Sequence, residues 1–116
     1  MAKDCEDGSL MLMAANEPGL LYIIQENESQ EYFKVGVTKD ENNLKLRLQN
    51  LQSGNWRELI LKDSAKVNNM NLAEKFTHDE LKAYNIKAGG GTEWFKTNYQ
   101  TVKAAFKKAV KKYPPK

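Results

Sequence analysis

Two short strand-like segments separated by a polar turn constrain this chain most strongly. Residues 20–24 and 32–38 are rich in β-branched and aromatic side chains, which favour extended structure. Residues 26–31 between them are all polar, as expected for a solvated turn. The stretch 19–38 therefore predicts a β-hairpin around which the remaining chain is arranged.

Side chains alternate across a strand, so this hairpin has two different faces. One face gathers five apolar side chains: Leu21, Ile23, Phe33, Val35 and Val37. Tyr22 lies on the opposite face, and in the matching register Lys34, Gly36 and Thr38 share it. A phenol, an ammonium and a glycine that clears space indicate a functional surface. The alternative is an ordinary half-buried hairpin with a packed tyrosine.

Length and composition place the hairpin in a single soluble domain. The chain has 116 residues, of which 41% are hydrophobic and 28% charged, values typical of globular proteins. We expect an acidic tail and lead-in over residues 1–18 and one domain over residues 19–116. The apolar run 10–15 is too short to span a membrane, and the residues before it are acidic, unlike an export signal. Cys5 is the single cysteine, which predicts an intracellular, reducing compartment, cytoplasm or nucleus.

Charge is distributed unevenly along the chain. Residues 1–32 hold seven acidic residues and one lysine, whereas residues 33–116 hold seventeen lysines and arginines and eight acidic residues. A basic field attracts phosphate backbones. The same excess also occurs on solvated helices, so both interpretations stay open from charge alone.

Hydrophobic periodicity predicts a helix over residues 44–52. Three leucines at i, i+4 and i+7 form its apolar stripe: Leu44, Leu48 and Leu51. Asn42 or Asn43 is expected to cap its start. Arg47 lies off the stripe, where a solvated arginine is the simple interpretation.

A third strand and a second helix are expected next. Residues 56–66 alternate in part and predict the strand, and residues 70–84 predict a helix that follows a cluster of capping asparagines. Its expected buried side chains are Ala73, Phe76, Thr77, Leu81 and Tyr84. Glu74 and His78 are i, i+4 neighbours on the border of that stripe, so they face partly towards the sheet. A border ion pair is the alternative role for them.

The last third of the sequence predicts a loop, an edge element and a basic helix. Residues 85–92 contain three glycines that indicate flexibility, without the lysine of a phosphate-binding loop. Residues 93–96 predict a short edge element whose aromatics close the core. Asn98 is expected to cap a final helix that ends before Pro114. Five lysines decorate this helix as a solubilising face or a nucleic-acid contact: Lys103, Lys107, Lys108, Lys111 and Lys112.

Five short segments combine in a particular order and spacing. They are Leu20-Leu21-Tyr22, Lys34-Val35-Gly36-Val37-Thr38, Arg47-Leu48 with Leu51-Gln52-Ser53-Gly54-Asn55, Glu74 with His78, and Glu93-Trp94-Phe95. Together they resemble the GIY-YIG nuclease superfamily, specifically its short phage- and bacterial-type branch. The resemblance covers residues 19–96, about two-thirds of the chain. Leu-Leu-Tyr and Lys-Val-Gly replace the literal Gly-Ile-Tyr and Tyr-Ile-Gly.

The resemblance implies an α+β fold with a three-stranded, mainly antiparallel sheet flanked by helices, and an enzyme that cuts nucleic-acid phosphodiesters with one Mg²⁺ or Mn²⁺. Carried over by position, Tyr22 would activate the attacking water, and Lys34 would replace the second tyrosine. Arg47 would bind the scissile phosphate, and Glu74 would bind the metal. His78 matches an accompanying polar position of the catalytic set. The late Glu-Trp-Phe motif is expected to be mainly structural.

The chemistry of phosphodiester cleavage agrees with these roles. Charge builds on the phosphate, so an arginine fork and a hard cation stabilise the reaction. Mg²⁺ keeps most of its waters, so a single glutamate is an adequate ligand. An ammonium beside a tyrosine would lower the phenol pKa from about 10.

The residues expected to contact nucleic acid are Thr38, Lys103, Lys107 and Lys111.

Two other functions fit the sequence. One is a catalytically inactive nucleic-acid-binding module of the same fold, and the other is a protein-interaction domain that uses Trp94 and Phe95. The joint presence of Tyr22, Arg47 and Glu74 favours the enzyme, because binding alone does not need the carboxylate. We expect DNA as the partner, no membrane association, and a substrate choice that is broad or set by a protein partner.

Overall fold

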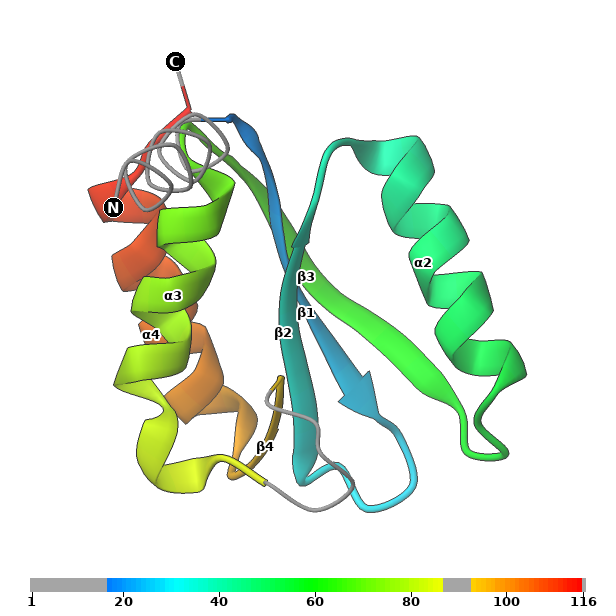
Figure 1. Cartoon of the computed structure of the whole chain (residues 1–116). Coiled ribbons are helices and arrows are strands. Elements are labelled where there is room, and N and C mark those ends of the chain that lie inside the picture. The colour runs from blue at the N-terminus through cyan, green and yellow to red at the C-terminus, as the bar shows by residue number, and fades with distance from the viewer. Residues whose placement is uncertain (1–16, 87–92, 116) are drawn as a thin grey trace, which may run out of the picture.

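The computed structural model describes residues 17–86 and 93–115 (Figure 1). Its elements, in chain order, are β1 (Gly19–Glu26), β2 (Tyr32–Thr38), α2 (Glu41–Ser53), β3 (Leu59–Val67), α3 (Met70–Glu80), the 3₁₀ turn η1 (Lys82–Tyr84), β4 (Trp94–Lys96) and α4 (Tyr99–Lys112). The expected acidic tail, the apolar run 10–15 and the glycine loop lie outside the described residues. No helix in the described residues is long and apolar enough to cross a membrane.

The sheet is antiparallel throughout and has four strands in the order β3-β1-β2-β4. The α+β class and the antiparallel pairing are confirmed, but the expected number of three strands is wrong. Strand β4 is the additional member and pairs with the start of β2 through Tyr32, Phe33 and Lys34. A three-residue strand separated from its partner by two helices has little periodicity of its own, so the sequence indicated only an edge element.

The hairpin register is the one that the alternation predicted. Tyr22 lies opposite Gly36, and Ile24 lies opposite Lys34. Directly opposed residues of an antiparallel pair share a face. Tyr22, Lys34 and Gly36 therefore do lie on one side of the sheet.

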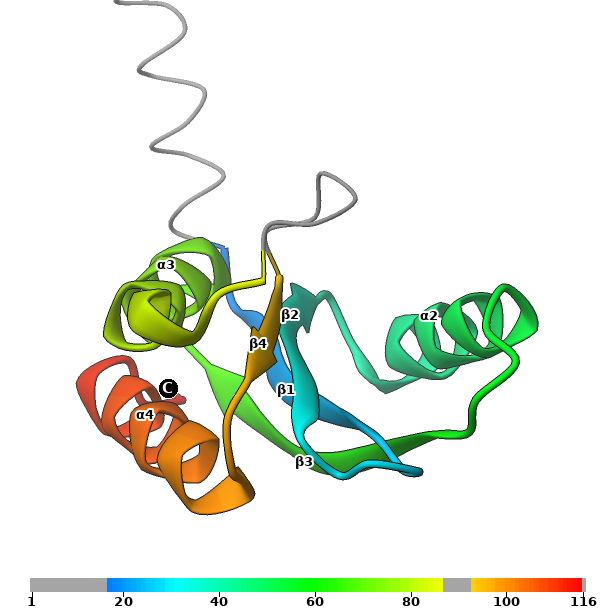
Figure 2. The same ribbon diagram turned by 90° about the horizontal axis from the view of Figure 1, so that it is seen from below.

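The sheet separates two layers of helices (Figures 1 and 2). Helices α3 and α4 cover the face that carries the apolar hairpin residues, and the main core forms there between Leu21, Phe33 and Phe106. Helix α2 covers the other face, where Leu44 packs in a smaller cluster with Tyr22. The two faces thus differ in character, as the hairpin alternation requires.

Several boundaries differ from the sequence expectations. Helix α2 begins at Glu41, and Asp40 caps it by accepting a hydrogen bond from the Asn43 backbone amide at 2.9 Å, so neither expected asparagine is the cap. Strand β3 begins at Leu59, and Trp56, expected within it, is 80% exposed.

Helix α3 is shorter than predicted. It ends at Glu80, and Tyr84 in the following turn is 41% exposed rather than buried. The expected caps Asn69 and Asn98 do accept hydrogen bonds at the starts of α3 and α4.

Candidate active site

The Tyr22 side chain lies across Gly36 on the α2 side of the sheet. A Cβ added at Gly36 would lie 2.5 Å from the phenol oxygen, far closer than van der Waals contact. Tyr22 is almost fully buried and packs with Leu44 of α2. The missing side chain at position 36 therefore creates the space that the phenol occupies.

Lys34 lies on the same face and is also buried. Its ammonium forms an ion pair with the Glu93 carboxylate, just before β4. Lys34 and Gly36 are separated by one residue on β2, so the ammonium is a same-face neighbour of the position that the phenol covers. The buried Tyr22 phenol therefore has as its neighbour a buried ammonium, Lys34, that is paired with the Glu93 carboxylate.

Arg47 comes from α2, which covers the Tyr22 face, whereas Glu74 comes from α3, which covers the opposite face of the sheet. Arg47 is an exposed residue of α2, and Glu74 is a half-buried residue of α3. The charges of both act on Tyr22 and on Lys34, so four side chains from β1, β2, α2 and α3 share one electrostatic environment. Within residues 17–86 and 93–115, neither Arg47 nor Glu74 has an ion pair or a side-chain hydrogen bond. Both groups are thus available to a ligand.

Burial dominates the acid–base properties of this set. It raises the pKa of Tyr22; the positive charge of Arg47 opposes this rise, and the negative charge of Glu74 adds to it. The expected lowering of the phenol pKa is therefore wrong, because desolvation of the phenolate outweighs the positive charge of Arg47. Burial also lowers the pKa of Lys34, Arg47 lowers it further, and Glu74 acts in the opposite direction.

His78 lies one turn after Glu74 and contacts the edge of β2. Its Nε2 is 2.8 Å from the Val35 carbonyl oxygen, and its ring lies against Phe95 at 5.3 Å between centroids. A carbonyl only accepts, so Nε2 must carry the proton. The imidazole therefore fixes α3 to the strand that carries Lys34 and Gly36.

The remaining predicted contacts divide between the two faces. Thr38 is buried at the end of β2, opposite Leu20, and alternation puts it on the Tyr22 side. Lys103, Lys107 and Lys111 belong to α4, which covers the other side of the sheet (Figure 2). Lys103 also forms an ion pair with Asp63. The structure does not bring these three lysines together with the four site residues.

The donor side chains around Glu74 limit which metal ion this site could hold. The described residues contain no group of three or more histidine, cysteine, aspartate or glutamate side chains able to hold an ion. A site for zinc, which normally takes four protein ligands or three plus water, does not fit here. One unpaired carboxylate, Glu74, fits a cation that retains its waters and also binds substrate phosphate oxygens, as Mg²⁺ does.

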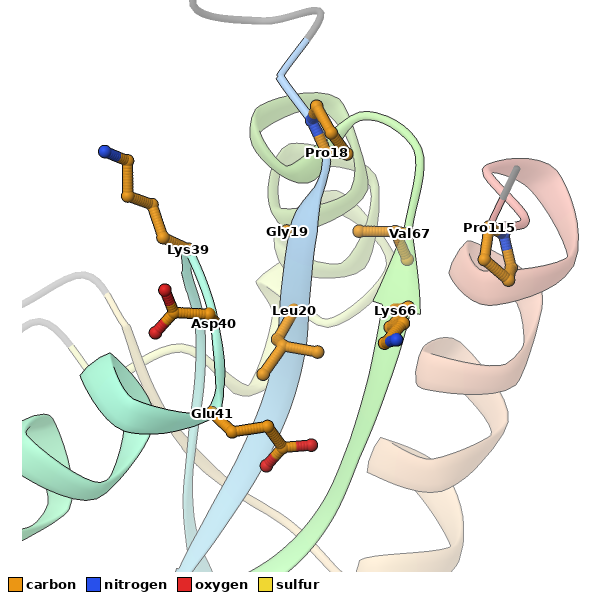
Figure 3. A pocket seen from close by; sticks show the side chains of 9 residues that line it. All are labelled: Pro18, Gly19, Leu20, Lys39, Asp40, Glu41, Lys66, Val67 and Pro115. Atoms are coloured by element: carbon orange, nitrogen blue, oxygen red, sulfur yellow. The ribbon is translucent and has the colours of Figure 1, made fainter.

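A hollow of about 440 Å³ lies at one end of the sheet (Figure 3). Its lining is mostly apolar and includes Leu20 and Val67, with two lysines and two carboxylates at its rim. One of those carboxylates, Asp40, already caps α2. None of the four site residues lines this hollow, so it is a feature separate from the candidate site.

Comparison with known proteins identifies the family. The T5orf172 domain model matches residues 19–110, well over half of the chain, so the chain belongs to the T5orf172 domain family. This family is nuclease-like, of phage origin, and related to GIY-YIG endonuclease folds. No curated protein and no solved structure gives a significant match.

Sequence reasoning missed one charged partner of this set. Glu93 was assigned to a structural motif, yet its carboxylate pairs with Lys34 across 59 residues of chain. The pairing of β4 with β2 creates this contact, and the sequence predicted no such pairing. A signal was nevertheless present, because a lysine in the middle of a buried strand requires a counter-charge.

Proposed function

We propose that this protein is a metal-dependent endonuclease that hydrolyses nucleic-acid phosphodiester bonds, with DNA as the expected substrate. The observation that carries the proposal is the gathering of a phenol, two cations and an unpaired carboxylate from four elements. That carboxylate, Glu74, is half-buried and forms no ion pair within the described residues. Membership of a nuclease-like family supports the same assignment.

Each side chain has a role that follows from its chemistry. The guanidinium of Arg47 binds the scissile phosphate in a forked geometry and stabilises the charge that builds there. The phenol of Tyr22 would orient the attacking water by a hydrogen bond, and only after losing its own proton would the resulting phenolate take one from that water. The buried Lys34 ammonium adds a fixed positive charge beside that reaction, in the place of a second tyrosine.

Glu74 would hold one Mg²⁺ or Mn²⁺ through its unpaired carboxylate. When bound, the cation supplies Lewis-acid stabilisation of the phosphate oxygens. Within this chain, the Glu74 carboxylate on α3 would be the residue that holds the cation. His78 supports this position from the next turn of α3, through its hydrogen bond to Val35.

Replacing Glu74 with Gln tests the proposal directly. We expect plasmid nicking in Mg²⁺ to fall by several orders of magnitude, because the cation stabilises charge that develops only in the transition state. The free energy of unfolding should change by less than about 1 kcal/mol, since glutamine has nearly the helix propensity of glutamate. DNA affinity without metal should hold or rise, because one negative charge leaves a phosphate site.

The matched control is Glu80→Gln, which removes a carboxylate from the same helix where it pairs with Lys108. This variant should nick at the wild-type rate. Wild-type nicking by Glu74→Gln would remove Glu74 from the site. A wild-type protein that binds DNA but does not cut it with Mg²⁺ or Mn²⁺ would instead favour the inactive binding module.

A further inference from the structure

Backbone hydrogen bonds, independent of the Glu93 side chain, hold Glu93 beside the candidate site. Its carbonyl accepts a hydrogen bond from the Val35 amide at 3.1 Å, and the next residue, Trp94, accepts one from the Ile86 amide at 2.9 Å. Strand pairing then sets Trp94 opposite Lys34. The backbone of Glu93 and Trp94 is thus hydrogen-bonded to Val35 on one side and to Ile86 on the other, and this places the Glu93 carboxylate next to Lys34.

The contact matters because of what surrounds Lys34. The Lys34 side chain is 8% exposed, whereas that of Glu93 is 39% exposed. Arg47 of α2 repels the ammonium, Glu74 of α3 attracts it, and the phenol of Tyr22 on β1 is uncharged while protonated. Of the charged groups that face Lys34 in the described structure, Glu93 alone forms an ion pair with it. A buried ammonium without such a partner is strongly disfavoured.

We propose that Glu93 is a positioning residue of the active site, whose carboxylate keeps the Lys34 ammonium charged and in place on the sheet face that carries Tyr22. This inference rests on the proposed nuclease function and assigns it one further residue. It also explains how a lysine can occupy a site position otherwise expected to hold a tyrosine. The carboxylate compensates the buried charge that the substitution introduces.

A simpler role for the pair would be to fasten β4 to β2. In that case, removing the Glu93 carboxylate would lower the free energy of unfolding. The rate of cleavage would not depend on whether Lys34 is protonated. The two roles differ in whether the rate of cleavage falls when the Lys34 pKa falls. They also differ in whether charge or only polarity is needed at position 93.

The experiment uses the full chain and four variants. Glu93→Gln removes the charge and keeps the shape, and Glu93→Asp keeps the charge with one methylene less. Glu31→Gln is the matched control, because Glu31 is an exposed carboxylate at the start of the same strand pair. Lysine amines are labelled as ¹³C-dimethylamines and titrated by NMR, with the Lys34 signal identified by its loss in Lys34→Arg. Plasmid nicking in Mg²⁺ is measured in parallel.

We expect Glu93→Gln to lower the pKa of Lys34 and to reduce nicking by roughly 10- to 100-fold, the cost of a misplaced catalytic group. Glu93→Asp should give intermediate values for both, and Glu31→Gln should match the wild type. If the Gln variant fails to fold, the Asp variant alone carries the comparison. An unchanged Lys34 pKa in Glu93→Gln overturns the inference. If Glu93→Gln does not fold, an unchanged Lys34 pKa in Glu93→Asp overturns it.

Two further outcomes separate the inference from the proposed function. A lowered Lys34 pKa with wild-type nicking shows that the pair only fastens β4, and it overturns the positioning role while the nuclease function stands. A wild-type protein that nicks no substrate rejects the nuclease function and the positioning role together. The Lys34 titration is read independently of cleavage in every case.

Discussion

The phenol of Tyr22 occupies the space that a side chain at position 36 would need. The backbone of Gly36 does not adopt the left-handed conformation that favours glycine, so only this close approach excludes larger residues. Gly36 is therefore a requirement of the Tyr22 position rather than of the strand. The two residues should behave as one unit when they are mutated.

Gly36→Ala should destabilise the fold by about 1–3 kcal/mol, because the added methyl overlaps the Tyr22 ring. In a Tyr22→Ala background the ring is absent, and the same change should cost less than about 0.5 kcal/mol. Urea unfolding of the two single variants and the double variant measures this coupling. Equal costs in both backgrounds would show that Gly36 serves the strand and not the phenol.

His78 shows how a titratable residue can have a role that is insensitive to its charge. Both the neutral tautomer protonated at Nε2 and the imidazolium donate to the Val35 carbonyl. The contact with Phe95 likewise needs only the ring. The hydrogen bond from His78 therefore survives in either protonation state, as suits a residue that holds α3 against β2.

Among the elements, the β1–β2 turn is organised by one buried carboxylate. Glu26 accepts hydrogen bonds from the Ser29 hydroxyl and from the backbone amides of Glu28 and Ser29, and it pairs with Arg57 at 3.3 Å. Burial acts to raise the Glu26 pKa, but these hydrogen bonds and the Arg57 charge together lower it below its ordinary value of 4.5. The turn is thus linked to the start of β3 through a charge.

This linkage predicts a loss of stability in acid. On acidification the unfolded chain protonates Glu26 first, so its contribution is complete above about pH 4.5 and is lost as the pH falls through the lower folded pKa. Urea midpoints between about pH 6 and pH 3 should therefore fall more steeply for the wild type than for Glu26→Gln. Glu28→Gln, which changes the exposed carboxylate two residues on, should follow the wild-type curve. Parallel wild-type and Glu26→Gln curves would contradict the assignment.

Elements with strong periodicity could be predicted from the sequence, and contacts between distant elements could not. Alternation in β1 and β2 sufficed for the register, because a slip by one residue would move Leu21 and Ile23 out of the main core to the α2 side of the sheet. The cap of α2 was missed because Asp40, Asn42 and Asn43 are all good capping residues, and only the backbone decides among them.

Exposure was harder to predict than secondary structure. Trp56 was assigned to β3 on its apolar character, but it lies in the preceding loop with the Arg57 guanidinium 4.8 Å from its ring centroid. The four site residues could be named through a family resemblance, because each stands in a recognisable motif. Glu93 could not be given its contact with Lys34, since that contact depends on a strand pairing with a sequence separation of about 60 residues.

At the scale of the whole molecule, positively charged side chains lie on the helices that cover both faces of the sheet. Arg47 is exposed on α2 beside Tyr22, whereas the lysines of α4 lie behind the sheet (Figure 2). A phosphate bound at the Tyr22 site is separated from α4 by the sheet itself. The α4 helix therefore lies on the opposite side of the sheet from a phosphate bound there.

We expect Lys107→Gln combined with Lys111→Gln to leave the salt dependence of DNA binding unchanged. Arg47→Gln should reduce the slope of log Kd against log salt by about one unit, the amount for one phosphate contact. Fluorescence anisotropy with a labelled duplex between about 50 and 200 mM NaCl measures both slopes. A decrease of about two units in the double lysine variant would show that DNA also contacts the α4 face.

The two backbone hydrogen bonds of Val35 in β2 are completed only late during synthesis of the chain. Its amide bonds to Glu93 and its carbonyl to His78, and both partners leave the ribosome long after the hairpin itself. During synthesis the chain already carries Tyr22, Lys34 and Arg47 before it carries Glu74, and it gains the counter-ion of Lys34 later still. A nascent chain therefore carries three residues of the candidate site before Glu74 and Glu93 have been added. Such a polypeptide gains the full set of candidate residues only after most of the domain has been translated.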